Sequence, residues 1–276
     1  MSAIPPHAET APPTDPSPTT GTPPTPAHPR WRWGRRFLLL YILLLHALCV
    51  AVLWEPFLAV RVWAFLRNTP EERPDYRGMV AAHVVITRSL PAHATVFLGD
   101  SRMRDLDAAA VCDGPVYNLS IGGDTAHGLR SRLTQYSRLD TTRMVIVGVG
   151  VNDLSHVTDD EAVEEYHRLL DDLASRHPPR IVVCGVLPVD EPHYTQANSA
   201  WLRGLRVSNA RIAGFNQRLR SLCEGRSGVV FVDSAGPLLD DTGNLKSCYT
   251  ADGLHLNASG SAVWAAELKK LFTAIP

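Results

Sequence analysis

The sequence predicts a three-layer α/β/α sandwich with a central parallel sheet, preceded by a single transmembrane helix. Three observations predict this architecture. From Pro91 onwards, continuous aliphatic runs alternate with helical patterns, which is typical of parallel strands covered on both faces. Several of these runs end in glycine and small polar residues, as strands do where they enter tight turns. An apolar run without formal charge covers residues 37–54.

Length and composition allow one sizeable domain and exclude one class of partner. The chain has 276 residues, 45% of them hydrophobic, and a formal net charge of −1. No long basic run occurs in the main body, so we expect no nucleic-acid partner. The five cysteines show no Cys-x-x-Cys spacing and no nearby pair of histidines. We therefore expect neither a metal site nor a disulfide scaffold, although one or two disulfides stay open, and no cofactor.

Residues 1–36 are predicted to form a disordered tail. The part before Trp31 contains ten of the 21 prolines, interleaved with threonine, alanine and serine. Almost nothing in it could form a core. A solvated tether explains this composition better than a polyproline ligand, because no arginine-flanked Pro-x-x-Pro motif stands out.

Residues 37–54 are predicted to be a transmembrane signal anchor, since 18 uncharged residues just suffice to span a bilayer. The alternatives are a buried core helix and a cleaved signal peptide, for which a charged region of 36 residues is too long. Flanking tryptophans and preceding arginines favour the anchor: Trp31, Trp33, Trp54, Arg30, Arg32, Arg35 and Arg36. The positive-inside bias then predicts a single-pass protein of the cell membrane, with a cytoplasmic N-terminus and an extracytoplasmic domain.

Residues 55–90 are predicted to be a juxtamembrane connector, helical in parts, and residues 91–276 to be the domain. The aliphatic runs of the domain predict these strands: Val96–Leu98, Val116–Leu119, Met144–Val149, Ile181–Val186 and Val229–Val232. The helical patterns between them predict helices at about 125–138, 159–176, 206–223 and 258–273.

Ser101 stands where the first predicted strand of the domain ends. Residues 95–101 read Thr-Val-Phe-Leu-Gly-Asp-Ser, a buried strand that breaks into a tight turn. In open parallel sheets, ligands bind beyond the carboxyl ends of the strands, so this serine is a candidate nucleophile. Gly-Asp-Ser alone is a common turn, and its weight comes from three later segments.

Two of these segments carry candidate donors for a developing oxyanion. In the segment 117–125, paired glycines follow a strand, and the backbone N–H of Gly123 could donate to the oxyanion. In the segment 148–153, Asn152 follows an aliphatic strand and offers a neutral side-chain amide. The alternatives are a plain strand-to-helix turn at Gly123 and a helix N-cap or Asx turn at Asn152.

The last segment, residues 252–257, reads Asp-Gly-Leu-His-Leu-Asn. Asp252 and His255 stand three residues apart around a glycine, so they can meet in one loop. The carboxylate could hold the imidazole in the tautomer whose other nitrogen faces a nucleophile. A single histidine near a chain end is more often structural, but this one has an orienting acid immediately upstream.

Together the four segments resemble the SGNH, or GDSL-type, hydrolase family, whose blocks contribute Ser, Gly, Asn and His in this order. The resemblance covers residue 95 to the end and implies a flavodoxin-like SGNH hydrolase fold, as in membrane-anchored bacterial members. It implies a catalytic triad of Ser101, Asp252 and His255. It also implies an oxyanion hole formed by the N–H groups of Ser101 and Gly123 and the amide of Asn152.

Other polar residues of these segments are assigned more modest roles. Arg102 stands where many family members have leucine, and could either bind an acidic ligand or pair with Asp105 or Asp107 at the surface. We expect Asp100 and Asp153 to shape their turns through hydrogen bonds to the backbone. Asn257 is expected to cap the last helix, and surface positions are expected for three histidines: His127, His156 and His193.

The resemblance implies a membrane-anchored serine esterase that hydrolyses acyl ester or thioester bonds through an acyl-serine intermediate. The expected substrate is an ester-bearing small molecule, a lipid or an envelope glycan. One alternative is an O-acyltransferase that acts on an envelope glycan with the same site. The other is a non-catalytic envelope protein that keeps the fold for binding, although a binding module would not need all five matching residues.

Overall fold

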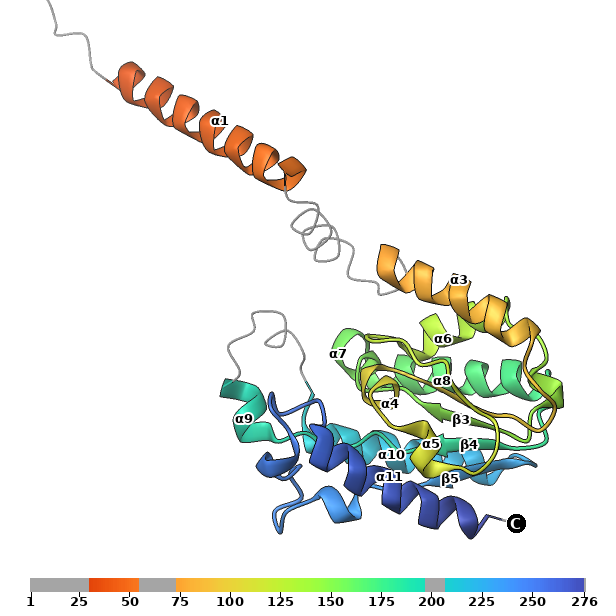
Figure 1. Cartoon of the computed structure of the whole chain (residues 1–276). Coiled ribbons are helices and arrows are strands. Elements are labelled where there is room, and N and C mark those ends of the chain that lie inside the picture. Colours follow the sequence, from red (N-terminus) through yellow and green to blue (C-terminus); the bar gives the residue numbers. More distant parts are fainter. Residues whose placement is uncertain (1–29, 55–72, 197–206, 276) are drawn as a thin grey trace, which may run out of the picture. The chain divides into compact units, whose positions relative to one another are not determined.

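The computed structural model describes residues 30–54, 73–196 and 207–275 (Figure 1). The chain divides into two compact units, Met1–Leu58 and Ala59–Pro276, and each is described by itself. Most of the predicted tail, residues 1–29, and the first half of the predicted connector, residues 55–72, lie outside the described residues.

The first unit contains helix α1, Arg30–Trp54, which includes the predicted span. The large apolar side chains between residues 37 and 50 are exposed along it. Among the described residues, however, no helix combines the length and the hydropathy that are needed to cross a bilayer. The structure thus gives a helix over residues 37–54 but does not support the prediction that this segment spans a membrane.

The second unit is built on a parallel sheet with the strand order β2-β1-β3-β4-β5. The five described strands agree with the predicted ones to within two residues at each end: β1 Thr95–Gly99, β2 Val116–Asn118, β3 Met144–Gly148, β4 Ile181–Cys184 and β5 Val229–Val232. All neighbouring strands are parallel. Because β1 lies between β2 and β3, the segments that leave these three strands start side by side.

Helices join these strands, and they include three of the four predicted helices to within three residues, the exception being α6. The described α-helices of this unit are α3 Pro74–Arg88, α4 Ser101–Arg104, α5 Ala108–Val111, α6 Ala126–Leu133, α7 Asp153–His156, α8 Asp159–Ala174, α9 Glu191–Gln196, α10 Asn209–Glu224 and α11 Ala258–Thr273. Short 3-10 turns are η2 Leu139–Thr141, η4 Gly236–Leu238 and η5 Ser247–Tyr249. As predicted, Asn257 caps α11, with its side chain accepting from the N–H of Gly260 at 3.0 Å.

Two predicted elements end earlier than expected. β4 stops at Cys184 because the side-chain amide of Asn216 binds both the N–H and the C=O of Val186, at 2.8 Å each. Helix α6 stops at Leu133 instead of residue 138, because the next turn directs Tyr136 into the interior and Arg138 adopts φ 60°. Neither signal can be seen in the local apolar pattern.

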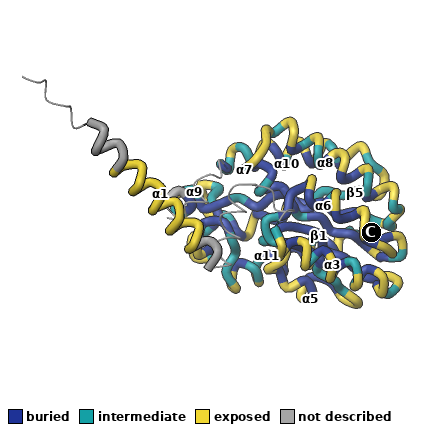
Figure 2. Tube along the Cα trace, turned by 90° about the horizontal axis from the view of Figure 1, so that it is seen from above, coloured by how far each residue is buried: buried dark blue, intermediate teal, exposed yellow. Residues whose placement is uncertain are grey.

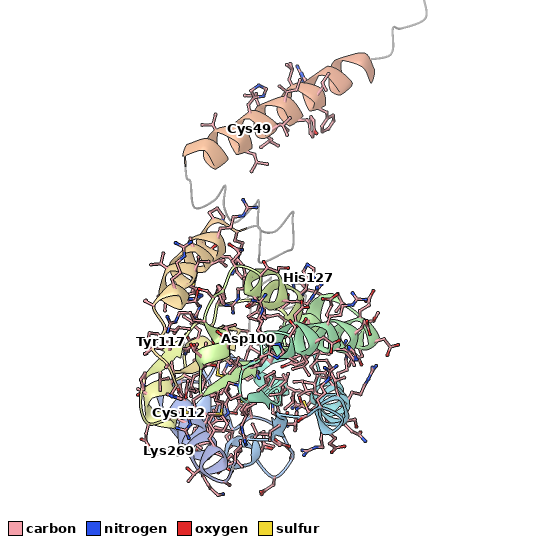
Figure 3. All side chains as sticks on the ribbon, turned by 90° about the vertical axis from the view of Figure 1, so that its right-hand side faces the viewer. Cys49, Asp100, Cys112, Tyr117, His127 and Lys269 are labelled. Atoms are coloured by element: carbon pink, nitrogen blue, oxygen red, sulfur yellow. The ribbon has the colours of Figure 1, made fainter. Side chains whose placement is uncertain are left out.

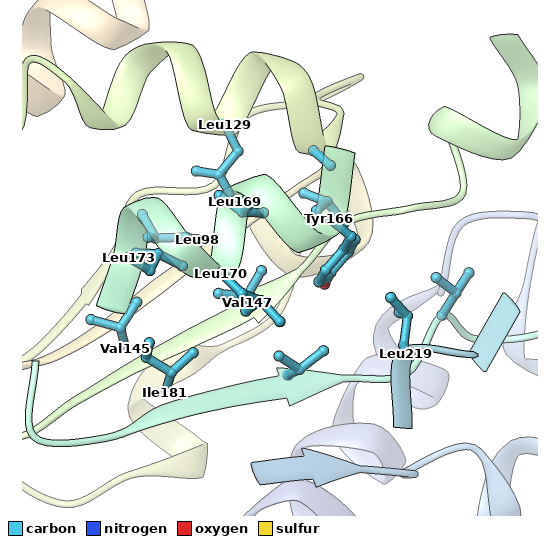
Figure 4. Close-up of a cluster of buried hydrophobic side chains, with 14 of the residues drawn as sticks. Leu98, Leu129, Val145, Val147, Tyr166, Leu169, Leu170, Leu173, Ile181 and Leu219 are labelled. Carbon is cyan, nitrogen blue, oxygen red and sulfur yellow. The ribbon is translucent and has the colours of Figure 1, made fainter. Parts of the chain in front are cut away.

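Helices cover both faces of the sheet, and side chains alternate between two cores. Val96 and Leu98 point toward α6, α8 and α10, while Phe97 points toward α4, α5 and α11. Figure 4 shows the first core, where Leu169 and Leu173 of α8 pack over β1, β3 and β4. Figure 2 shows that the strands are buried and the outer helix faces exposed. The predicted α/β fold with a central parallel sheet is confirmed.

The carboxyl ends of β1 and β3 are joined through two glycines. Gly99 lies in register with Gly148. A Cβ atom on Gly99 would lie 2.4 Å from Cβ of Met103, and one on Gly148 would lie 2.3 Å from its Cε. Met103, which is fully buried, therefore fills the space that two absent Cβ atoms leave, and α4 packs directly against the strand ends.

Helix α3 covers the second half of the predicted connector and packs on the domain. Its buried residues are Tyr76, Val80, His83 and Thr87. Tyr76 and Val80 form a small apolar cluster with Ile121, which precedes the paired glycines. α3 therefore belongs to the second unit, as does the loop that it contacts.

Candidate active site

Residues from the first three motif segments come together at the carboxyl ends of the adjacent strands β2, β1 and β3. Ser101 is the first residue of α4, directly after β1. A Cβ atom on Gly122, in the segment after β2, would lie 3.9 Å from Cβ of Ser101. The segment after β3 reaches the same place, because Nδ2 of Asn152 donates to the C=O of Asp124 at 2.9 Å. The topology of the sheet thus brings the predicted residues into one site.

The fourth segment places His255 between Ser101 and Asp252. Nε2 of His255 lies 2.9 Å from Oγ of Ser101, and its Nδ1 lies 2.7 Å from Oδ2 of Asp252. An ionised carboxylate can only accept hydrogen bonds, so the proton of a neutral imidazole resides on Nδ1. The lone pair on Nε2 then faces the hydroxyl group of Ser101, as a general base requires.

Asp252 is held ionised by its own loop. Its Oδ1 accepts hydrogen bonds from the backbone N–H groups of Leu254 and His255, at 2.9 and 2.8 Å. Burial by itself raises the pKa of this carboxyl, but the hydrogen bonds from His255 and the two backbone N–H groups outweigh burial and hold the pKa well below its usual range. The carboxylate therefore orients the imidazole over the whole neutral pH range.

Three N–H donors in these loops face no acceptor among the described residues. The N–H of Ser101 is the first of α4 and lies beyond the reach of intrahelical bonding. The N–H of Gly123 has no hydrogen bond to any described residue. Asn152 uses one of its two amide hydrogens on Asp124 and has the other left. Such donors, fixed by the backbone before a substrate binds, suit a developing negative charge.

Asn152 does not use its side chain as a cap. It occupies the N-cap position of α7, but it has helical backbone angles and makes no side-chain capping bond. Its amide reaches across to the loop after β2 instead. The N-cap interpretation of this residue is therefore wrong, although an asparagine here does have a structural contact.

Comparison with known proteins gives the family. The model of the GDSL-like Lipase/Acylhydrolase family matches residues 89–263, which is more than half of the chain. The chain belongs to this family. It is therefore a hydrolase that acts on esters. Among curated proteins, none matches the chain significantly.

Solved structures share the fold of this GDSL-like hydrolase at low identity. A Streptococcus pneumoniae protein described as a platelet activating factor has a TM-score of 0.67 at 24% identity, over 77% of this chain and 98% of its own. A protein of Bacteroides fragilis described as an acylhydrolase has a TM-score of 0.59 at 17% identity, over 70% of this chain and 95% of its own. A GDSL-like lipase of Bacteroides thetaiotaomicron has a TM-score of 0.58 at 16% identity, over 70% of this chain and 97% of its own.

Arg102 of this GDSL-like hydrolase has a role that the sequence did not suggest. Its side chain is buried and donates to backbone carbonyls of two segments, to Leu254 at 2.9 Å, to Leu187 and to Pro188 at 3.4 Å. Burial lowers its pKa to about 10, against the opposing effect of Asp100, so it stays charged at neutral pH. Both predicted roles, an acidic ligand and a surface ion pair, are wrong. The arginine ties α4 to the loop that carries His255.

A buried ion pair beside the paired glycines was also missed. Asp124 and Arg132 are 0% and 1% exposed, and their side chains meet at 2.8 Å. Arg132 also donates to the C=O of Leu119 at 2.8 Å and to the hydroxyl of Tyr136 at 2.6 Å. Burial lowers the pKa of Arg132, but the Asp124 carboxylate together with Tyr136 and Tyr76 more than offsets this effect, so the pKa is raised. The pair fixes the loop after β2 to α6.

Asp100 binds the backbone of its own turn, as predicted, whereas Asp153 binds the backbone of another segment, at the start of α6. Asp100 accepts from the N–H of Arg102 at 2.9 Å, and Asp153 accepts from the N–H of Ala126 at 2.9 Å. Figure 3 shows Asp100 among the packed side chains of the domain. Burial raises the pKa of Asp100 to about 6, against the charge of Arg102, and that of Asp153 to about 7.

Surface positions are confirmed for His127 and His156, which are both exposed, while His193 is half-buried and lies 3.8 Å from Asp190. His127, labelled in Figure 3, lies 3.4 Å from Glu165. All five cysteines are free thiols. The part of the chain that the structure describes holds no cluster of side chains suited to a metal ion.

A cavity of about 660 Å³ lies away from these residues, between α10 and the segment that follows β5. No residue of the four motif segments lines it. Two of its amide side chains, Asn209 and Asn216, are already bonded to the backbone of residues 186 and 189. The other polar side chains of its lining are Gln217, Arg220, Asp233 and Glu267. Because the four motif segments lie elsewhere, the site around Ser101 remains the candidate active site.

The buried Asp153 gives the stability of this hydrolase a pH dependence. Its pKa is about 7 in the folded state and about 3.9 in the unfolded chain, so the folded state binds more protons between these values. The free energy of unfolding therefore falls as the pH rises from about 4 to about 7. Asp153→Asn removes the titrating carboxyl group and keeps a side-chain oxygen that accepts from the N–H of Ala126.

Melting temperatures of wild type and Asp153→Asn between pH 4 and 8 check this prediction. The variant should be relatively more stable at pH 7 than at pH 4, and the exposed Asp140→Asn should show no such trend. A constant difference between Asp153→Asn and wild type over this range would mean that Asp153 is ionised throughout.

Proposed function

We propose that this chain is a serine esterase that cleaves acyl ester or thioester bonds with Ser101 as the nucleophile. The observation that carries the proposal is the continuous line of hydrogen-bond contacts from Ser101 Oγ to His255 Nε2, and from His255 Nδ1 to Asp252 Oδ2. A nucleophile, a base and an orienting acid within hydrogen-bond distance are what nucleophilic acyl transfer requires.

In the first step, His255 accepts the hydroxyl proton of Ser101 at Nε2 while Oγ attacks the carbonyl carbon of the substrate. Asp252 stabilises the imidazolium that forms and keeps the ring in place. The protonated Nε2 then donates its proton to the leaving alcohol or thiol. The acyl group is left as an ester on Ser101.

In the second step, water replaces the alcohol and the same groups act in reverse. His255 takes a proton from the water molecule, whose oxygen attacks the acyl-serine carbonyl. The proton on Nε2 then returns to Oγ of Ser101 as the carboxylic acid leaves. No cofactor is needed, because each step only moves a proton and an acyl group.

Negative charge on the carbonyl oxygen develops in both steps and is stabilised by the N–H groups of Ser101 and Gly123 and by the amide of Asn152. The support for these assignments is that the two backbone N–H groups have no acceptor among the described residues, and that Asn152 uses only one of its two amide hydrogens on Asp124. Each such donor is worth roughly 10²- to 10³-fold in rate when it is fixed in advance.

The triad assignment predicts that Ser101→Ala and His255→Ala each remove most ester turnover, and that the double variant loses little more, because triad members act as one unit. Turnover of a p-nitrophenyl ester and labelling by a fluorophosphonate, read by mass spectrometry, measure both effects. The exposed Ser227→Ala, at the opposite end of β5, is the matched control and should behave as wild type. Near wild-type turnover by Ser101→Ala would overturn the assignment.

The oxyanion assignment predicts that Asn152→Ala lowers kcat by about 10²- to 10³-fold with KM nearly unchanged, because the donor acts on charge that exists only in the transition state. Loss of its bond to Asp124 should lower stability by about 1 kcal/mol. Asn152→Asp should be slower still, since a carboxylate repels an oxyanion.

Kinetic constants and melting temperatures for both variants separate the two contributions of Asn152. A lower melting temperature with unchanged kcat in Asn152→Ala would leave only the structural contact with Asp124. An Asn152→Asp enzyme that is stable and fully active would remove this residue from the oxyanion hole.

We further propose, from the sequence pattern of residues 30–54, that the esterase is anchored in a cell membrane with its domain outside. The support is the uncharged run over 37–54, the flanking tryptophans and the preceding arginines. An enzyme held at a membrane surface would meet ester-bearing lipids, envelope glycans or small molecules there.

The proposed topology predicts that protease added to intact cells degrades the domain and spares the N-terminal tail. Blotting of the full chain, tagged at each end, after fractionation and protease treatment measures this result. Recovery of the whole chain in the cytosolic fraction would contradict the anchor, whereas recovery of a shortened exported form would indicate cleavage.

A further inference from the structure

Arg73 reaches the paired glycines from outside the segment that the family model matches. It occupies the N-cap position of α3, and residues 73–88 precede the matched residues 89–263. Its Nη2 donates a hydrogen bond of 2.6 Å to the C=O of Gly122. This contact joins residues 49 positions apart in sequence.

The C=O of Gly122 and the N–H of Gly123 belong to the same peptide unit. In a planar trans unit these two groups point in opposite directions, so fixing one fixes the other. A charged donor on the oxygen also polarises the unit and makes its N–H a better donor. Arg73 therefore sets both the direction and the donor strength of the Gly123 N–H.

The conformation of Gly123 is suited to this contact. Its φ of +80° is strained for any residue with a side chain. A Cβ atom at this position would also lie 3.3 Å from Nη2 of Arg73. The absent side chain thus leaves the space in which the guanidinium lies against the peptide unit.

The first turn of α3 also holds the other end of this loop. The hydroxyl group of Tyr76 donates to Oδ1 of Asp124 at 2.8 Å. The C=O of Asp124 accepts from Asn152, the other oxyanion candidate. Two side chains of α3, three residues apart, therefore fix both ends of the segment 122–124.

We propose that Arg73 is a positioning residue of the esterase, which acts through the Gly122–Gly123 peptide unit to aim the Gly123 N–H at the oxyanion. The proposal rests on the oxyanion hole of the proposed function and adds α3 to it. It also makes the reaction rate dependent on the docking of the helix that leads into the domain.

Arg73→Ala in the full chain should lower kcat by about 10- to 100-fold with KM little changed, as expected when a reacting group is misplaced by a fraction of an ångström to an ångström. Affinity for a boronic acid, which binds Ser101 as a tetrahedral anion, should fall by a similar factor. The matched control is Arg77→Ala, one turn further along α3 and exposed, which should match wild type.

Two further measurements separate positioning from other effects. Between roughly 0.05 and 0.5 M NaCl the Debye length falls from about 13 to about 4 Å, so a direct effect of the arginine charge on the oxyanion would weaken over this range. If Arg73 acts by positioning, the ratio of wild-type kcat to Arg73→Ala kcat should stay constant. Guanidinium ion at millimolar concentration should partly restore kcat in Arg73→Ala, and sodium chloride should not. Arg73→Met, which keeps the aliphatic stem, replaces Arg73→Ala if the latter melts early.

An unchanged kcat and unchanged boronic acid affinity in a folded Arg73 variant would overturn the proposal, as would a rise in KM alone. These results differ from a failure of the proposed function, which would appear as ester turnover retained by Ser101→Ala. A ratio of wild-type to variant kcat that falls steadily with salt would also contradict the proposal, because it would show that Arg73 acts on the oxyanion only through its charge.

Discussion

The arrangement of the candidate site depends on one buried carboxylate, that of Asp124. Removing a charge from water costs several kcal/mol unless it is paired and hydrogen-bonded, and Asp124 is fully buried. Its side chain meets Arg132 of α6, Tyr76 of α3 and the backbone N–H of Thr125, while its C=O accepts from Asn152 after β3. Arg132, Tyr76 and the N–H of Thr125 compensate the burial of the carboxylate, and they hold the loop after β2 in place. The bond from Asn152 ties the same residue to the segment after β3, so the donors on either side of it are fixed with it.

The sheet and the reacting residues could be predicted because both follow from local patterns. Aliphatic runs such as those around Val96 and Ile146 give buried parallel strands, and parallel strands bring their carboxyl ends to one edge. Ser101 and Asn152 directly follow such strands, so the fold itself brings them together. Asp252 and His255 are three residues apart, and their contact depends on a single loop.

The residues that hold the site in place could not be predicted, because their roles depend on which distant groups their long side chains contact. Arginine is most often exposed to solvent, yet Arg102 and Arg132 are both buried. Arg102 donates to a segment that is distant in sequence, and Arg132 pairs with Asp124 in the protein interior. The sequence around α3 predicts a connector that is helical in parts, without showing which surface the helix covers. β4 likewise ends where Asn216, some thirty residues later, takes over the backbone of Val186.

Gly99, Gly148 and Met103 set how far the nucleophile stands above the sheet. Met103 occupies the volume that side chains at Gly99 and Gly148 would fill. The absence of these two side chains therefore determines how closely α4, and with it Ser101, packs on the sheet. His255 is held by its own loop. Because Arg102 of α4 donates to the C=O of Leu254 in that loop, a shift of α4 would strain this contact as well. The three positions therefore vary together: an alanine at residue 148 is compatible with the site only in a chain that also carries a smaller side chain at residue 103. An alanine at residue 99 would in addition meet the backbone oxygen of Gly148 at 2.6 Å, which no change at residue 103 removes.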